Sequence, residues 1–204
     1  MSFKKLIEPL KNTLENLEFE TPLDFQKASI PKIKSGVNVF GIAPEGSGKT
    51  TTLILSVIQK LNGQAFEDVP RAIIVVKNKQ EALALRDKFN VFTRHIDLRV
   101  YCAYEEQNIE AQRDDIYVGV DVIIATPKRL NKLFLLNSIS FSLLKMFIVE
   151  DAEFSTISNN FQDINRITES INKCQYVIFA KKFDSKIKRF QESFMYNSQV
   201  VEIQ

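Results

Sequence analysis

A glycine-rich turn followed by a lysine and a threonine is the part of this sequence best equipped for chemistry. It reads Ala43-Pro44-Glu45-Gly46-Ser47-Gly48-Lys49-Thr50 and lies between an apolar run, 37–42, and a run with helical character, 51–61. Glycines allow the backbone to curl so that its N–H groups face a phosphate, and the following helix N-terminus adds to that attraction. Lys49 supplies a point charge for the terminal phosphates and Thr50 a hydroxyl for Mg²⁺. The flanking strand and helix favour a phosphate-binding loop (P-loop) over a chance Lys-Thr pair in a Gly/Ser turn.

Acidic residues after a second apolar run are the next candidates. The run reads Phe147-Ile148-Val149 and continues Glu150-Asp151-Ala152-Glu153. P-loop enzymes place carboxylates at a strand end, where they hold Mg²⁺ and orient the attacking water. Three acids after a strand would by themselves be typical of a solvated loop, but the P-loop favours the nucleotide interpretation.

Short β-rich runs alternate with segments of helical spacing along the chain. Several of the runs are almost purely apolar, which is typical of strands covered on both faces of a parallel sheet. The pattern therefore predicts an α/β fold with a doubly wound, mostly parallel sheet, whose ligands bind beyond the carboxyl ends of the strands. The seven runs are Val37–Ile42, Ala72–Val76, Leu98–Cys102, Val122–Ala125, Phe147–Val149, Tyr176–Ala180 and Gln199–Ile203.

The first 36 residues are expected to be helical, because leucines recur at spacings of three to four residues. These leucines are Leu6, Leu10, Leu14 and Leu17. We expect an N-terminal helical extension, residues 1–36, that joins a P-loop core, residues 37–204, in a single domain.

Composition narrows the protein class. The 204 residues are 45% hydrophobic and 25% charged, which is ordinary for a globular protein and excludes a disordered tail or a coiled coil. The net charge is only +2, so any nucleic-acid site must come from a local cluster of bases. No run approaches the roughly 20 apolar residues of a membrane helix, and Lys4, Lys5 and Glu8 occupy the place of a signal-peptide core. We therefore predict a cytoplasmic protein without a membrane partner.

The order of these features resembles the N-terminal RecA-like domain of the DEAD-box ATP-dependent RNA helicases. Residues 150–153, Glu-Asp-Ala-Glu, are similar to that family's Asp-Glu-Ala-Asp motif with the acids exchanged, and Ala43 is the residue with which its P-loop begins. Residues 19–26, Phe-Glu-Thr-Pro-Leu-Asp-Phe-Gln, resemble the Q motif, in which the glutamine reads adenine. The resemblance runs from about residue 3 to residue 203.

The resemblance implies a RecA-like helicase ATP-binding domain over residues 1–204, with ATP and Mg²⁺ as cofactors. It implies catalytic roles for Lys49, Glu150 and Asp151, and a metal site at Thr50 and Glu150. The implied nucleotide-binding residues are Gln26, Ala43, Pro44, Glu45, Gly46, Ser47, Gly48, Lys49, Thr50 and Thr51.

Two further segments point to RNA. Thr126 is a good N-cap and Pro127 a good first helical residue, so Lys128 and Arg129 would stand at a helix start that attracts phosphate. The segment resembles the family's Thr-Pro-Gly-Arg motif, with lysine in place of glycine. Asn78 and Lys79 repeat the arrangement after another strand, where the family has Pro-Thr-Arg-Glu. The alternative is a pair of well-capped surface helices with solvated bases. The expected RNA-binding residues are Asn78, Lys79, Thr126, Lys128 and Arg129.

Departures from the family pattern leave alternatives open. Asp151 is one methylene shorter than the water-orienting glutamate, and Ala180 and Lys182 lack the hydroxyls of the Ser-Ala-Thr motif. In the family, a second RecA-like domain supplies an arginine finger and half of the RNA clamp. We expect an RNA helicase domain that binds RNA weakly and without sequence preference. For efficient ATP hydrolysis and unwinding we expect it to need a second RecA-like domain, or a protein partner. The alternatives are a degenerate, non-enzymatic module for nucleotide and RNA or protein, and a different P-loop enzyme such as a small-molecule kinase.

Overall fold

The computed structural model describes residues 3–157 and 159–204 and contains one seven-stranded sheet. All strand pairs are parallel, in the order β3-β4-β2-β5-β6-β1-β7. Each of the seven expected strands is present, and only their ends differ by one or two residues. The strands are β1 (Val39–Ile42), β2 (Ala72–Val75), β3 (Val100–Ala103), β4 (Val122–Ala125), β5 (Met146–Val149), β6 (Gln175–Ala180) and β7 (Gln199–Glu202).

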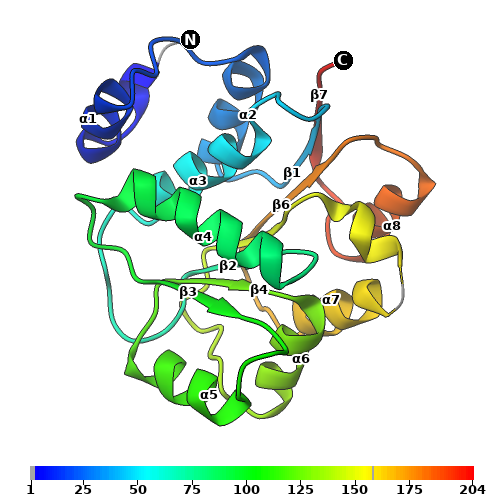
Figure 1. The fold of residues 1–204 in the computed structure, drawn as a ribbon. Coiled ribbons are helices and arrows are strands. Elements are labelled where there is room, and N and C mark those ends of the chain that lie inside the picture. The colour runs from blue at the N-terminus through cyan, green and yellow to red at the C-terminus, as the bar shows by residue number, and fades with distance from the viewer. Residues whose placement is uncertain (1–2, 158) are drawn as a thin grey trace.

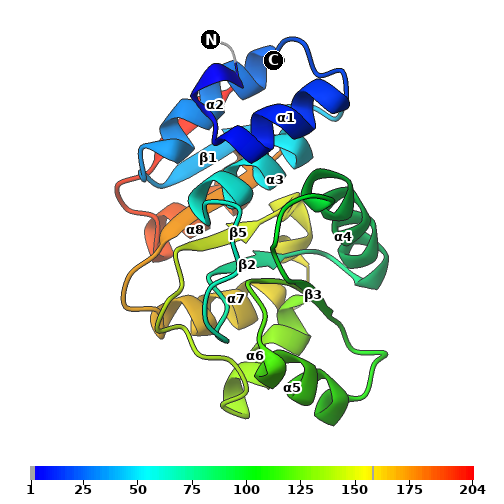
Figure 2. The same ribbon diagram turned by 90° about the vertical axis from the view of Figure 1, so that its left-hand side faces the viewer.

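Helices cover both faces of this sheet (Figures 1 and 2). One face carries α1 (Glu8–Asn16), α2 (Asp24–Lys34), α3 (Lys49–Lys60) and α4 (Lys79–Thr93). The other carries α5 (Ile109–Val118), α6 (Pro127–Leu135), α7 (Asn160–Glu169) and α8 (Ser185–Ser193). Two short 3-10 helices, η1 (Phe3–Lys5) and η2 (Ala152–Thr156), complete the elements. In the described part of the chain, no helix is long and apolar enough to cross a membrane.

The central strands are apolar throughout because each face of the sheet has its own core. In β2, Ala72 and Ile74 belong to the core under α1–α4, whereas Ile73 and Val75 belong to the core under α5–α8. All four side chains are fully buried. The doubly wound α/β fold predicted from the sequence is therefore confirmed.

The N-terminal helices are part of the first core. Leu10 and Leu14 of α1 are buried against it, and the Ile7 N–H donates to Gln59 Oε1 of α3 at 2.8 Å. Phe25 of α2 packs against Phe179 of β6, with ring centroids 6.1 Å apart. These contacts fix the start of α2 beside the carboxyl end of β1.

A buried carboxylate ties together three segments that precede strands. Asp121, fully buried, accepts from Arg71 Nη2 at 2.6 Å, from Arg99 Nε at 2.9 Å and from the Phe66 N–H at 3.1 Å. Burial opposes ionisation of this carboxyl, but the hydrogen bonds from Arg99, Arg71 and Phe66 prevail and lower its pKa. The cluster holds the amino ends of β2, β3 and β4 in line, away from the predicted site.

Because the sheet is parallel, the polar residues that follow its strands meet at one edge. The P-loop follows β1, Lys77 and Asn78 follow β2, and Thr126 follows β4. Glu150 and Asp151 follow β5, and Lys181 follows β6. The fold thus gathers most of the predicted site residues at the carboxyl edge.

Candidate functional site

The two glycines of the P-loop have backbone conformations that other residues rarely adopt. Gly46 has a φ of +79° and Gly48 a φ of +87°, both in the left-handed region that favours glycine. A Cβ at Gly48 would also lie 2.7 Å from Gln26 Nε2. A Cβ at Gly46 would meet nothing within 4 Å, so the space above this residue is open. The loop therefore has the curl and the free space that a phosphate needs.

Lys49 lies at the centre of this loop. Its side chain is 7% exposed, and its ammonium donates to the carbonyls of Ala43 at 2.7 Å and Pro44 at 2.9 Å. Ser47 Oγ also donates to Pro44 O, at 2.8 Å. The lysine thus stabilises the loop conformation and keeps a positive charge in it.

Thr50 and Glu150 join the P-loop to the end of β5. Thr50 Oγ1 donates to Glu150 Oε1 at 2.8 Å. Burial raises the pKa of Glu150 to about 7; the Thr50 hydrogen bond opposes this rise and the charge of Asp151 adds to it. A divalent cation beside this oxygen pair would favour the ionised carboxylate, because opposite charge offsets desolvation. Hydroxyl and carboxylate oxygens are ligands that suit Mg²⁺.

Asp151 is more exposed and is held in an unusual conformation. Its φ is +45°, a value that aspartate tolerates better than most residues. Its side chain is 53% exposed, and Oδ1 lies 4.0 Å from the Lys49 ammonium. Asp151 is therefore free to contact a ligand while remaining next to the P-loop lysine.

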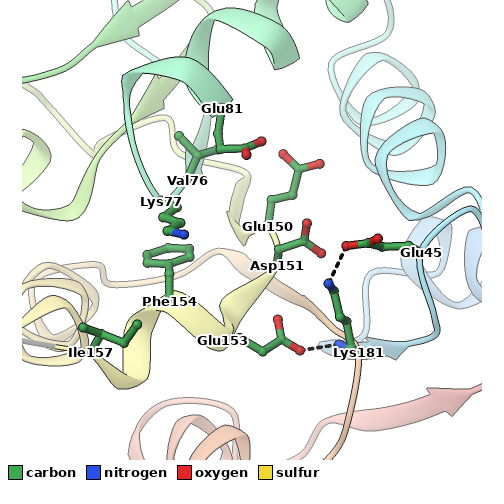
Figure 3. Close-up of a pocket in the computed structure, with 10 residues that line it drawn as sticks. All are labelled: Glu45, Val76, Lys77, Glu81, Glu150, Asp151, Glu153, Phe154, Ile157 and Lys181. Atoms are coloured by element: carbon green, nitrogen blue, oxygen red, sulfur yellow. Dashed lines mark hydrogen bonds and ion pairs between the residues drawn. The ribbon is translucent and has the colours of Figure 1, made fainter.

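A cavity of about 350 Å³ lies beside Glu150 and Asp151 (Figure 3). It brings together Glu45 of the P-loop and residues that follow β2, β5 and β6. Its walls are strongly acidic, with Lys77 and Lys181 as the two cationic side chains. The lining residues are Glu45, Val76, Lys77, Glu81, Glu150, Asp151, Glu153, Phe154, Ile157 and Lys181.

Gln26 lies beside the P-loop, as the nucleotide interpretation predicts. It is in the first turn of α2 and only 3% exposed. Its Oε1 accepts from the Leu23 N–H at 2.9 Å, and its amide nitrogen packs against Gly48. The fold brings Gln26 and Lys49 to the same loop from 23 positions apart in the sequence.

The predicted RNA residues after β2 lie at the same edge. Asn78 is the N-cap of α4, and its Oδ1 accepts from the Glu81 N–H at 2.9 Å. The ammonium of Lys79 lies over the Tyr104 ring, 5.1 Å from its centroid. This N-cap agrees with the sequence analysis, whereas the stacking on Tyr104 was not predicted.

The segment after β4 differs from expectation in its hydrogen bonds. Thr126 occupies the N-cap position of α6 with Pro127 next to it, but its hydroxyl donates to Glu105 Oε2 at 2.6 Å and does not cap the helix. Arg129 is 6% exposed and donates to the carbonyls of Glu105 at 2.7 Å and Gln107 at 3.1 Å. Lys128 is exposed. Of the bases in this segment, Lys128 is therefore the one that can reach a phosphate without rearrangement.

The contacts of two charged residues at the edge, Lys181 and Glu105, were missed by the sequence analysis. Lys181 forms an ion pair with Glu45 of the P-loop, and its main-chain N–H donates to Glu153. Glu105 holds both Thr126 and Arg129. For Glu45 and Lys181, which are 136 positions apart, opposite charge after neighbouring strands was the available signal. The contacts of Glu105 had no such signal, because Thr126 is uncharged and Arg129 binds the main-chain carbonyl.

Comparison with known proteins agrees with this geometry. Residues 23–183 match the family model of the DEAD/DEAH box helicases. The pre-mRNA-processing ATP-dependent RNA helicase PRP5 of Candida albicans is 31% identical over 195 residues, which are 92% of this chain and 22% of that protein. The ATP-dependent RNA helicase dbp3 of Neosartorya fischeri is 28% identical over 208 residues, 99% of this chain and 40% of that protein.

Solved structures extend the likeness to the whole fold. A DEAD box protein from Methanococcus jannaschii superposes with a TM-score of 0.90 at 21% identity, over all of this chain and 56% of that one. The chain spans less than half of the length of the two curated relatives described above. Since the family model covers well over half of the chain, the protein belongs to the DEAD/DEAH box helicase family, and its fold is that of the N-terminal RecA-like domain.

Proposed function

We propose that this domain binds ATP with Mg²⁺ and RNA, and that it needs a second RecA-like domain for efficient hydrolysis and unwinding. The supporting observation is the link from Thr50 of the P-loop to Glu150 of the altered acidic motif, beside the buried Lys49. The matched relatives named above are ATP-dependent RNA helicases by name, which fits this proposal.

The roles of the residues follow from their positions. The N–H groups of the P-loop and the Lys49 ammonium would bind the phosphates, and Gln26 would contact adenine next to Gly48. Thr50 and Glu150 would hold Mg²⁺, which supplies charge neutralisation. In the described residues no group of three or more His, Cys, Asp or Glu forms a metal cluster. Mg²⁺ often binds through one or two carboxylates and completes its coordination with phosphate and water oxygens, so this site fits it.

Hydrolysis would rest on Asp151 and on a group from outside this chain. Asp151 would orient the attacking water, but it is one methylene shorter than the glutamate that the family uses. A displacement of about 1 Å can cost on the order of 100-fold in rate. An arginine finger contributes roughly 10³–10⁵-fold, and in this family it comes from the second domain. We therefore expect the 204-residue chain to hydrolyse ATP barely above background.

A non-enzymatic nucleotide-dependent module is the second candidate, and it is favoured by residues 180–182, which stand in place of the Ser-Ala-Thr motif. Ala180 and Lys182 have no hydroxyls with which to couple hydrolysis to strand separation. Glu153 contacts the main-chain N–H of Lys181 instead. The acidic motif therefore contacts residues 180–182 through the backbone and not through the hydroxyl side chains that the family uses.

The deciding experiment compares nucleotide binding with hydrolysis. Calorimetry with ATP and Mg²⁺ should show binding by the chain, and hydrolysis should rise by several orders of magnitude in a form that includes a second RecA-like domain and RNA. Binding without any hydrolysis in that complete form would favour the non-enzymatic module. Absence of binding to both ATP and ADP would overturn the proposal.

A further inference from the structure

The ion pair between Glu45 and Lys181 forms part of the wall of the cavity. Glu45 belongs to the P-loop and Lys181 follows β6, and the dashed lines of Figure 3 show the lysine bonded to both Glu45 and Glu153. The two segments are held side by side because the Ala43 N–H donates to Ala180 O at 3.1 Å. The side chains remain partly solvated, with Lys181 46% and Glu45 79% exposed. A ligand can therefore reach both.

Two lysines, Lys181 and Lys49, stabilise the Glu45 carboxylate. Lys181, with a smaller contribution from Lys49, lowers the pKa of Glu45. Lys181 has its own pKa raised by Glu45 and, more weakly, by Asp151 and Glu153. The Glu45 carboxylate is thus paired with Lys181 and is also stabilised by the charge of the P-loop lysine. A phosphate group bound in the loop would present negative charge to the same two cations.

We propose that Lys181 recognises the terminal phosphate of ATP, and that Glu45 holds the Lys181 ammonium when that phosphate is absent. The inference rests on the proposed function, because it assumes that the nucleotide binds in the P-loop. A triphosphate brings an additional negative group to the cavity, where it repels Glu45 and attracts Lys181. ADP lacks this group and leaves the Glu45–Lys181 pair in place. The exchange of partners gives the domain a preference for ATP over ADP.

A purely structural role for the pair predicts a different pattern. If the ion pair only ordered the P-loop, losing either partner would weaken ATP and ADP equally, and losing both would be no worse than losing one. If Lys181 recognises the terminal phosphate, its loss weakens ATP selectively. The loss is larger where Glu45 no longer competes for the ammonium, because exposed ion pairs must be broken before their cation is free.

The test measures affinities for ATP and for ADP, each with Mg²⁺, by calorimetry on the full 204-residue chain. The variants are Lys181→Met, Glu45→Gln and the double variant, with Lys182→Met as the matched control at the next position. We expect Lys181→Met to weaken ATP about three- to tenfold and ADP less than twofold. Glu45→Gln should strengthen ATP, and Lys181→Met should weaken ATP more in the Glu45→Gln background than in the wild type. Lys182→Met should change neither affinity.

Two results separate the failure of this inference from the failure of the proposed function. Equal weakening of ATP and ADP by Lys181→Met, with wild-type binding intact, overturns the role of Lys181 alone. No measurable binding of either nucleotide to the wild-type chain overturns the proposed function and the inference together. Misfolding does not confuse the comparison, because the Lys181 N–H that contacts Glu153 belongs to the main chain and survives the substitution. Unchanged melting temperatures of the variants would verify this.

Discussion

At the scale of single residues, Lys49 is unusual because it is both buried and charged. Its ammonium is held by two carbonyls of its own loop, so the charge is already in place before a ligand arrives. Replacing Lys49 with Ala should remove a charge-assisted hydrogen bond to phosphate, worth about 1.5–3 kcal/mol, and weaken the binding of ATP and ADP by roughly 10- to 150-fold. Calorimetry measures this loss, and Lys60→Ala at the far end of α3 serves as the control.

Gln26, which lies beside the same loop, should determine which nucleotide base is preferred. Because it packs against Gly48, a nucleotide base next to the P-loop would contact its amide. We expect the wild-type chain to bind ATP more tightly than GTP. Gln26→Ala should reduce this preference, while nucleotide affinity should still depend on Lys49. Competition between the two nucleotides in a fluorescence assay measures the ratio. Equal affinity for ATP and GTP would contradict the assignment of Gln26 to adenine.

The exchanged acids Glu150 and Asp151 form a linked pair. In a form with a second RecA-like domain, Glu150→Asp together with Asp151→Glu should raise the hydrolysis rate, and each change alone should raise it less. Neighbouring sites are not additive, and here metal and water act on the same phosphate. The left-handed backbone at position 151 favours aspartate over glutamate, so part of the gain will be lost to strain.

Single-turnover hydrolysis by the four combinations, with saturating ATP–Mg²⁺ and RNA, measures this effect. Asp151→Ala provides the reference in which no carboxylate can orient water. If neither the double exchange nor Asp151→Ala changes the rate in the complete form, Asp151 does not orient the water and the non-enzymatic module gains support.

At the scale of elements, the alignment of three strands depends on one buried carboxylate. Replacing Asp121 with Asn would leave Arg71, which is 2% exposed, without its charged partner. Breaking a buried pair in this way typically costs about 3–5 kcal/mol in the free energy of unfolding. Urea denaturation measures the loss. Asp68→Asn is the control, because its contact with Arg99 is largely exposed and should cost less than about 1 kcal/mol.

The same carboxylate predicts how stability depends on pH. The pKa of Asp121 is lower in the folded chain than its ordinary value of 3.8, so folding favours the ionised form. Its contribution is present in full above the unfolded pKa and is lost as the pH falls through the folded pKa. The stability difference between wild type and Asp121→Asn should therefore be constant from pH 5 to 7 and shrink below about pH 4. A difference that stays constant down to pH 2 would contradict this assignment.

The elements were predictable from the sequence to the extent that burial alone decides them. Strands such as Ala72–Val75 are apolar at every position, because alternate residues are buried in the two cores on opposite faces of the sheet. This apolar pattern can be recognised in the sequence alone. The hydrogen-bond partner of the Thr126 hydroxyl could not be predicted in this way. Its residue type favours capping, but a carboxylate from the loop after β3 offers a stronger acceptor. Long-range partners such as Glu45 and Lys181, 136 positions apart, follow from the strand order, which no local pattern contains.

At the scale of the whole molecule, RNA binding should be weak and dependent on salt. The net charge is only +2. Of the three bases predicted to bind RNA, Arg129 is occupied by carbonyls, which leaves Lys79 and Lys128 to neutralise phosphates. Two phosphates of a single strand give a log–log salt slope of about −1.4, at roughly −0.7 per phosphate. Fluorescence anisotropy of labelled single-stranded RNA at several salt concentrations measures this slope for the 204-residue chain.

The variants of these bases sharpen the same measurement. Lys128→Ala should reduce the magnitude of the slope by about 0.7, from about −1.4 to about −0.7. The change should be the same for every RNA sequence tested, because a phosphate contact carries no base information. Lys132→Ala, in the last turn of the same helix, is the matched control and should leave the slope unchanged. Tight binding that does not respond to salt would mean that the RNA contacts are of another kind.

The place of β1 in the sheet also has a consequence for the order in which the protein is made. The strand that carries the P-loop pairs with β6 on one side and β7 on the other, so Val39 has Val177 and Gln199 as its neighbours. A ribosome adding about 5–20 residues per second needs roughly 8–30 s to pass from β1 to the end of β7. Until that interval ends, the P-loop sequence lacks at least one of the two strands that flank β1. An unfinished chain that stops before β7 would therefore carry the motif but lack one strand of the sheet that supports it.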